Sequence, residues 1–343
     1  MLTSPKIPLK SEIFSDEKLQ LITGQIFVGQ AILVAYKLGL FKIILEKIFS
    51  LKEIAINLSI NERAAQAIVT CACSLDLIEF VENGYRLSAL GKVYFDEKNP
   101  EYYGKVLDLL IQENHIMNFE TIKKCLTSNQ QQICEKGELF SASESLSSTA
   151  EFIASLHHKA YNPAFFWSKT NLLASCKKMV DLGGGSGIHT IAACLNHSHL
   201  LGLVCDRPGV LPHTSRYIEE FGLTDRIIPI PLNIWEDPFP LGDLYFLSDI
   251  FHDWSREKCI FLAKKCFQHL PNKGHIVIHE MLFNSDKTGP LLTAAYNMKM
   301  MVWTEGQQFS FPEICDILQE AGFKDIREDK ALGNWSIVVG QKQ

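Results

Sequence analysis

The pattern of apolar and polar positions predicts that the first hundred residues form helices followed by a short hairpin. The run 26–45 is apolar at nearly every turn, which predicts a helix buried on more than one side. Ser50 and Glu53 match the capping box that begins a helix. Asn61 is of the type that caps a helix, here one running to about Leu75.

Two β-prone runs come next, Ile78–Val81 and Tyr85–Leu87, on either side of Asn83-Gly84. Asn-Gly between such runs is the strongest short signal of a hairpin. Two helices and a hairpin predict a winged helix, a fold that often binds DNA. The helix that would enter a groove has Arg63 as its one basic residue, whereas groove recognition needs several. We therefore expect this module to dimerise rather than to bind DNA.

The remainder of the chain changes from helical patterns to an alternation of strands and helices. Residues 100–170 are expected to be helical, with a linker at Ser128–Ser148. Beyond them, the alternation predicts a mostly parallel sheet covered on both faces. The expected strands are Met179–Leu182, Gly202–Cys205, Ile227–Pro231, Leu244–Ser248, His275–His279 and Trp335–Val339, with helices between them that include Ile188–Leu195, Ser255–His269 and Phe311–Ala321.

Composition and charge narrow the class of protein. The 343 residues are 47% hydrophobic and 21% charged, with a net charge of −6, which fits a soluble globular chain of about two domains. An acidic balance without a basic block argues against a nucleic-acid partner. The ten cysteines contain no Cys-x-x-Cys pair. No apolar stretch approaches the roughly 18–20 residues of a membrane span. We expect a reduced, cytoplasmic protein with no membrane partner.

The strongest chemical signal is a glycine-rich turn between a strand and a helix at Val180–Gly187. Glycines allow a tight turn and let a ligand approach the backbone closely. The following strand ends at Asp206, and a carboxylate at that place can accept hydrogen bonds from both hydroxyls of a ribose. Together these features predict a nucleoside at the carboxyl ends of the strands. The candidate residues for binding it are Asp181, Gly183, Gly185, Gly187 and Asp206.

With these residues the chain resembles the S-adenosylmethionine-dependent small-molecule O-methyltransferases typified by the caffeate and acetylserotonin enzymes. Four stretches carry the resemblance: Val180–Gly187, Asp206–Val210, His252–Trp254 and Gly289–Gln308. It extends over nearly the whole chain. The implied fold is a Rossmann-like α/β domain with a mostly parallel seven-stranded sheet, preceded by an α-helical winged-helix dimerisation domain.

The same resemblance implies an organisation of the chain into three segments. Residues 1–105 would form the dimerisation domain, 106–170 a helical linker that contributes to the substrate pocket, and 171–343 the S-adenosylmethionine-binding domain. The closing runs Phe323–Arg327 and Trp335–Val339 resemble the antiparallel edge at which methyltransferase sheets end. A homodimer acting on a small molecule is the implied assembly.

The implied chemistry needs few groups, because the sulfonium of S-adenosylmethionine is already an activated methyl donor. The protein must place a nucleophilic oxygen in line and remove its proton. His252 matches the family's base, and Glu280 matches a glutamate that orients it. Asp253 is expected to cap the helix that begins near Ser255. Either an aryl pocket or ordinary core packing would suit Met298, Met300, Met301 and Trp303.

No metal is expected. Asp249, His252 and Asp253 are close in the sequence, but mixed Asp/His spacing within one turn is weak evidence for a metal site. S-adenosylmethionine is therefore the one small molecule, besides the acceptor, that the resemblance implies.

Three positions depart from the family pattern. The family's adenine-side aspartate is Asn233, beside Ile234, and an asparagine still offers hydrogen bonds to adenine. Where the family has a basic residue three positions before its histidine, this chain has Asp249, which reverses the charge beside the nucleoside. By resemblance, Asn233, Ile234 and Asp249 join the residues expected to bind S-adenosylmethionine. Where the family has a second glutamate near the base, this chain has Gln308, whose amide can hold the geometry but supplies no charge.

These departures leave more than one hypothesis open. The leading one is an O-methyltransferase that acts on a hydroxyl of a small aromatic or polyketide-like metabolite. A second keeps bound S-adenosylmethionine but catalyses a cyclase- or decarboxylase-like reaction. A third is a catalytically silent, dimeric binding protein, and a fourth is a transcription factor acting through the winged helix. The presence of His252 and Glu280 favours an active enzyme, whereas Asp249 and Gln308 keep the alternatives open.

Overall fold

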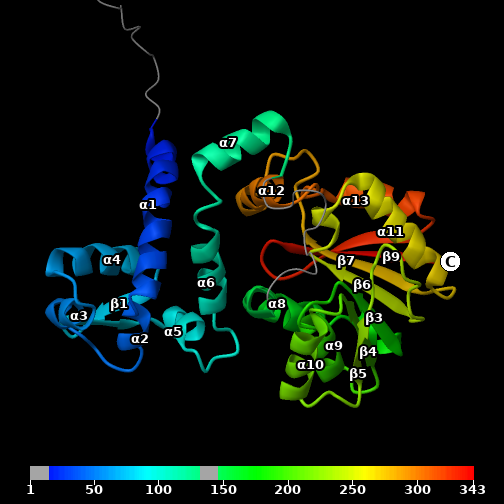
Figure 1. Cartoon of the computed structure of the whole chain (residues 1–343), viewed down its shortest axis with the longest axis horizontal. Coiled ribbons are helices and arrows are strands. Elements are labelled where there is room, and N and C mark those ends of the chain that lie inside the picture. The colour runs from blue at the N-terminus through cyan, green and yellow to red at the C-terminus, as the bar shows by residue number, and fades with distance from the viewer. Residues whose placement is uncertain (1–14, 132–145) are drawn as a thin grey trace, which may run out of the picture. The chain divides into compact units, whose positions relative to one another are not determined.

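The computed structural model describes residues 15–131 and 146–343, and the chain divides into two compact units, residues 1–104 and 105–343 (Figure 1). Each unit buries apolar side chains of its own. The motifs that are predicted to bind a nucleoside all lie in the second unit.

The N-terminal unit contains the predicted helices and hairpin. Ser50 accepts a hydrogen bond from the Glu53 N–H while the Glu53 carboxylate accepts one from the Ser50 N–H, so the predicted capping box is confirmed. The Asn61 side chain caps the next helix by accepting from the Ala64 N–H. The elements are α1 (Glu17–Lys37), α2 (Leu40–Ile43), α3 (Leu51–Asn57), α4 (Glu62–Ser74), β1 (Ile78–Val81), β2 (Gly84–Leu87) and α5 (Ala89–Phe95).

The helix predicted over 26–45 is wrong in its bounds and in its burial. Helix α1 begins nine residues earlier, at Glu17, and ends at Lys37; Gly39 then adopts the left-handed region at φ 86° and α2 follows. Ala35 is the one residue of α1 whose side chain is fully buried. The polar residues that precede position 26 hid the true start of the helix from the periodicity.

Within the described unit α1 exposes most of its apolar side chains. Leu19, Ile22, Ile26 and Phe27 are 66%, 63%, 67% and 76% exposed. The expectation that no stretch of the chain approaches a membrane span is also wrong, because Glu17–Lys37 has the length and apolar composition to cross a bilayer. Length and composition do not distinguish such a helix from one that packs against another protein chain.

The hairpin is confirmed, but its turn lies one residue earlier than predicted. Val81 pairs with Gly84, so Glu82 and Asn83 form the two-residue loop, and both have positive φ, 51° and 62°. These values are typical of a type I′ turn. Gly84 begins β2 instead, where a Cβ atom would lie 2.9 Å from the carbonyl oxygen of Phe49. Close backbone packing, rather than the turn, requires glycine there.

The C-terminal unit is a seven-stranded sheet in the order β5-β4-β3-β6-β7-β9-β8. Neighbours from β5 to β7 are parallel, while β9 is antiparallel to both β7 and β8. This confirms the predicted Rossmann-like sheet and its antiparallel edge. The strands are β3 (Lys178–Leu182), β4 (Leu201–Asp206), β5 (Ile227–Pro231), β6 (Leu244–Ser248), β7 (His275–Met281), β8 (Lys324–Lys330) and β9 (Trp335–Gln341).

Helices cover both faces of this sheet (Figure 1). Successive side chains of β3 point to opposite faces of the sheet. Val180 and Leu182 belong to the core formed with α11 and α13, whereas Met179 belongs to the core formed with α8, α9 and α10. The described helices of the unit are α6 (Gly104–Glu113), α7 (Phe119–Ser128), α8 (Leu146–Trp167), α9 (Ile188–Asn196), α10 (Leu211–Glu220), α11 (Arg256–His269), α12 (Leu291–Trp303) and α13 (Phe311–Glu320), with short 3₁₀ helices η1 (Asn171–Ser175) and η2 (Phe251–Asp253).

The linker predicted at Ser128–Ser148 lies mostly outside the described residues. Its two ends are helical, because they belong to α7 and α8. The roles predicted for segments 1–105, 106–170 and 171–343 remain predictions.

Candidate functional site

The glycine loop joins the carboxyl end of β3 to α9. Gly183, Gly185 and Gly187 have φ of 71°, 56° and 76°, a region that side chains disfavour. A Cβ atom at Gly184 would lie 2.7 Å from a methyl group of Val204 on the neighbouring strand. The loop therefore needs glycine for both its conformation and its packing.

Asp206, at the end of β4, binds this loop directly. One carboxylate oxygen accepts the N–H of Gly185 at 2.8 Å and the other accepts the N–H of Arg207 at 2.7 Å. Burial nonetheless raises the pKa of the Asp206 carboxyl. Asp181 lies beneath the loop, where it accepts a hydrogen bond from the Thr190 hydroxyl at 2.8 Å, and burial raises its pKa to about 7.

A cavity lies over the loop, between α8 and the carboxyl ends of β3 and β6. Its lining consists of apolar side chains of α8, the glycine loop, and polar residues at and after the end of β6. It is lined by Leu156, Ala160, Asp181, Gly183, Gly184, Gly185, Ser186, Ile188, His189, Ser248 and Asp249. These surroundings fit a nucleoside derivative, because the backbone is bare of Cβ atoms and carboxylates flank it.

Asn233 follows β5 and the adjoining residue Leu232. Its side-chain oxygen accepts the Trp235 N–H at 3.0 Å, and its own N–H donates to Asp237 at 2.7 Å. This leaves the amide NH₂ group as the part of the side chain suited to an adenine ring. The carbonyl of Ile234 accepts a hydrogen bond from Lys265 at 2.8 Å, and its side chain packs on the core.

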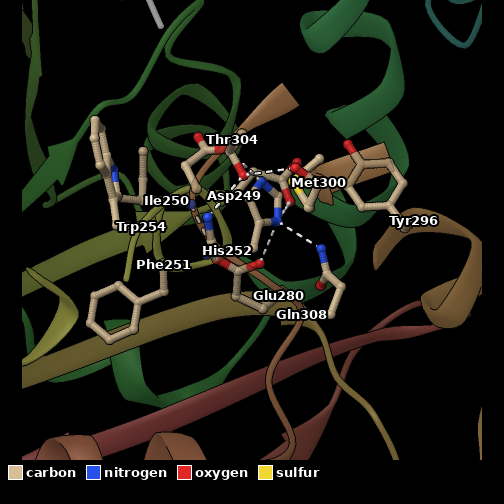
Figure 2. Close-up of polar contacts among 12 residues, drawn as sticks. Asp249, Ile250, Phe251, His252, Trp254, Glu280, Tyr296, Met300, Thr304 and Gln308 are labelled. Carbon is tan, nitrogen blue, oxygen red and sulfur yellow. Dashed lines mark hydrogen bonds and ion pairs between the residues drawn. The ribbon is translucent and has the colours of Figure 1, made fainter. Parts of the chain in front are cut away.

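His252 lies in η2, shortly after β6 (Figure 2). The residue is 4% exposed. Its Nδ1 is 2.9 Å from Oε2 of Glu280, the residue on β7 that the sequence assigned to orient it. The other oxygen of that carboxylate accepts the N–H groups of Ile250 and His252, at 3.1 and 3.3 Å. The Gln308 side-chain amide lies 3.1 Å from the same Nδ1. The structure thus brings together all three predicted catalytic residues.

Three carboxylates surround the imidazole. Besides Glu280, Asp253 is 3.5 Å from Nε2 and Asp249 is 3.6 Å from Nδ1. Burial works against a charged ring, but the three carboxylates outweigh it and raise the pKa of His252 to about 9. Asp253 was expected to cap α11; Ser255 occupies that position instead, accepting from Lys258, and Asp253 belongs to the surroundings of His252.

Asp249 makes a contact that the sequence did not predict. Its Oδ2 is 3.0 Å from Nζ of Lys159 on α8, and Lys159 also donates to the Tyr296 hydroxyl of α12 at 2.5 Å. Asp249 has φ 52°, a left-handed conformation that aspartate tolerates better than most residues. No local motif marked Lys159, because ninety residues separate it from its partner.

Gly306 is a further residue that sequence reasoning missed. A Cβ atom there would lie 2.5 Å from the Trp254 backbone nitrogen and closer still to the His252 carbonyl oxygen. The chain before Gln308 therefore packs directly on η2. Met300 is buried in α12, and the role of the methionines of this helix in an aryl pocket stays a prediction.

Asp249, His252 and Glu280 also have the ligand types and the proximity of a metal site, with one atom from each lying within 4.8 Å of the others. However, the Lys159 ammonium already contacts Asp249, and Nδ1 of His252 already contacts Glu280. A second cation would be repelled by Lys159. We interpret the cluster as an ion-pair network, and the absence of a metal remains a prediction.

Comparisons with known proteins address the family. Residues 155–324 match the family model of the O-methyltransferase domain. A 3-hydroxy-5-methyl-1-naphthoate 3-O-methyltransferase of Streptomyces sahachiroi is 27% identical over 94% of both chains. The acetylserotonin O-methyltransferase of Bos taurus is 33% identical over 47% of each chain.

The chain belongs to the S-adenosylmethionine-dependent O-methyltransferases. Among solved structures, human N-acetylserotonin methyltransferase in complex with S-adenosylmethionine has the same fold, with a TM-score of 0.85, 23% identity and coverage of 97% of this chain and 99% of that one. S-adenosylmethionine is the co-substrate of this methyltransferase, and its acceptor is a small molecule. The predicted family and fold are confirmed.

The individual ligand-binding residues remain predictions, and Asp206 gives the sharpest test. Replacing Asp206 with Ala removes the acceptor for ribose hydroxyls and the partner of the Gly185 N–H. We expect S-adenosylhomocysteine to bind at least about tenfold more weakly by calorimetry. Asp225→Ala, at an exposed aspartate, should leave binding unchanged. Equal affinity of wild type and Asp206→Ala would remove Asp206 from the site.

Proposed function

We propose that this methyltransferase transfers a methyl group to a hydroxyl of a small aromatic or polyketide-like metabolite, with His252 as the general base. The observation that carries the proposal is the 2.9 Å contact between Nδ1 of His252 and Glu280. It engages one ring nitrogen and leaves Nε2 to receive a proton. Bound S-adenosylmethionine supplies the activated methyl group and a positive charge.

Glu280 holds the base in one orientation. Two backbone N–H groups of the segment that contains His252 donate to one oxygen of this carboxylate, and Nδ1 of the ring lies 2.9 Å from the other. The carboxylate therefore fixes the backbone and the side chain of the same residue together. This arrangement keeps Nε2 in place and stabilises the imidazolium that forms when the acceptor hydroxyl loses its proton.

The charge of His252 must be adjusted before it acts. With a pKa of about 9 the ring is protonated at neutral pH, and a protonated ring cannot accept another proton. A positive charge nearby lowers the pKa of histidine. The donor's sulfonium therefore favours the neutral, reactive ring. Gln308 acts in the same direction, because an amide in place of the family's glutamate adds no further negative charge.

The acceptor class rests on the pocket and on a relative. Tyr296 and Met300 of α12 lie beside His252 (Figure 2). The Tyr296 ring centroid is 5.7 Å from that of the imidazole. Aromatic and thioether side chains suit a flat, apolar ligand. The relative from Streptomyces sahachiroi, which matches almost the whole chain, is named for a hydroxynaphthoate.

Removal of the base tests the mechanism. His252→Gln keeps a polar side chain but offers no group that accepts a proton at neutral pH. Turnover of a phenol panel with labelled donor should fall by about 10²-fold or more, while S-adenosylhomocysteine binding is retained. Glu320→Gln, at an acid of α13 that pairs with Arg256 on the surface, serves as the control. A His252→Gln enzyme with wild-type turnover would eliminate His252 as the base.

The pH dependence tests the role of Glu280. A base works when deprotonated, so kcat/KM for the donor, which reports the free enzyme, should rise with pH about a midpoint near pH 9 and level off above it. Glu280→Gln removes the carboxylate that raises the pKa of His252 most, so the midpoint should move to lower pH by about one unit or more. A midpoint that stays in place when Glu280 is replaced would show that its charge does not act on the base.

We further propose that the enzyme is a cytoplasmic homodimer that uses the exposed apolar side chains of α1. Light scattering should give a dimer, and Ile22→Asp with Phe27→Asp should give a monomer, because both side chains are more than 60% exposed within the unit. Leu241→Asp, at a side chain 71% exposed, should leave the dimer intact. A wild-type monomer that binds lipid vesicles would instead assign α1 to a membrane.

A further inference from the structure

The negative charge at position 249 creates a problem for the proposed base. The Asp249 carboxylate lies 3.6 Å from Nδ1 of His252, an imidazole that already contacts Glu280 and lies near Asp253. Each added carboxylate favours the protonated ring. The anion at position 249 therefore needs a nearby cation if the ring is to lose its proton near neutral pH.

Lys159 of α8 places a cation next to Asp249. Its Nζ lies 3.0 Å from Oδ2 of Asp249, and both side chains are largely shielded from water, with exposed fractions of 18% and 23%. The ammonium also lies 4.3 Å from the ring centroid of Tyr296 and 5.1 Å from that of Trp335. An ion pair so placed is screened much less by salt than a surface pair.

The protonation states agree with this geometry. Burial works against the charge of Lys159, but Asp249 and Tyr296 outweigh it and raise the pKa of the amine above its usual value. The ammonium in turn helps to hold the pKa of Asp249 below its usual value in spite of burial. Burial raises the pKa of Tyr296 to about 12, so its hydroxyl stays neutral. The contact is therefore one between an ammonium and a carboxylate.

We propose that Lys159 is a positioning residue that holds and neutralises Asp249, and thereby keeps His252 able to lose its proton. The pair joins α8 to the segment after β6 and offsets the negative charge of Asp249 where that charge faces the imidazole. This inference rests on the proposed role of His252 as the base.

Other groups facing His252 do not provide this balance. Glu280 and Asp253 are acids, and Gln308 is neutral. Burial lowers the pKa of His279, which faces Asp249, to about 4, so that ring is uncharged at neutral pH. Burial also holds the pKa of His189 on α9 well below its usual value, so that ring is uncharged as well. The ionisable groups around the ring and its carboxylate partner are Asp249 after β6, Asp253 of η2, Cys259 of α11, His189 of α9, His279 and Glu280 of β7, Tyr296 of α12 and Lys159 of α8.

Two single variants and their combination test the proposal. Lys159→Met keeps the length of the side chain but leaves Asp249 as an uncompensated anion, so His252 should titrate about one pH unit or more higher. Asp249→Asn removes the anion and leaves Lys159, so His252 should titrate lower. The double variant should titrate between the two single variants.

The titration is read directly by NMR of ¹⁵N-histidine in the full-length protein without donor, with the His252 signal assigned by its loss in His252→Gln. The pH dependence of kcat/KM is measured in parallel. Lys287→Met, which breaks an exposed ion pair with Glu313, is the matched control and should move neither reading. Should Lys159→Met fail to fold, a charge effect still predicts that His252 titrates at higher pH in the double variant than in Asp249→Asn, whereas a purely structural role predicts the same midpoint in both.

The outcomes separate this inference from the proposed function. If activity falls equally at every pH and the His252 midpoint stays in place in all three variants, Lys159 has a structural role and the inference is overturned. If the midpoints move as expected but no methylated product forms with any acceptor, or His252→Gln retains wild-type turnover, the charge balance stands and the proposed mechanism fails.

Discussion

The contact between His252 and Glu280 is the interaction on which the rest of the site depends. One carboxylate binds the imidazole and two backbone N–H groups of the segment that holds it, so β7 fixes the conformation of the chain after β6. Gly306 then allows the chain before Gln308 to pack on the same segment without a Cβ atom. A substitution at Glu280 therefore affects position and charge together, and the pH midpoint is needed to separate the two.

The sheet places this contact beside the donor loop. Parallel strands bring their carboxyl ends to one edge, and β3 lies between β4 and β6, so the glycine loop, Asp206 and His252 lie at that same edge although the chain between them is long. Helix α8 covers this edge, contributing Leu156 and Ala160 to the cavity and Lys159 to the ion pair with Asp249. The charge balance of the site thus depends on an element outside the sheet.

Local features of the fold were predictable because each depends on residues that are close together in the sequence. The strands alternate with helical patterns, the capping box at Ser50 and Glu53 has its own spacing, and the glycine loop at Val180–Gly187 marks the turn after β3. Long-range features were not. The exposure of α1 depends on what packs against it, and the turn at Glu82-Asn83 is fixed by the packing of Gly84 on Phe49.

The site shows the same limit. His252, Glu280 and Gln308 were predicted by resemblance and lie in contact, yet the reversed charge at Asp249 had no explanation in the sequence. Its partner Lys159 is ninety residues away on a helix with no motif, and only the tertiary structure brings the two together. Asp249, the departure from the family pattern that suggested weakened catalysis, is therefore one member of an ion pair with Lys159.

The central claim is that the surrounding charges set the protonation of the base, and the most direct test is an NMR titration of His252 in the wild-type enzyme. In the free enzyme the ring should titrate near pH 9. Saturating S-adenosylmethionine should lower that value more than S-adenosylhomocysteine, because only the former carries a sulfonium. A ring that titrates near its ordinary value of about 6.5, or equally with both ligands, would contradict the account.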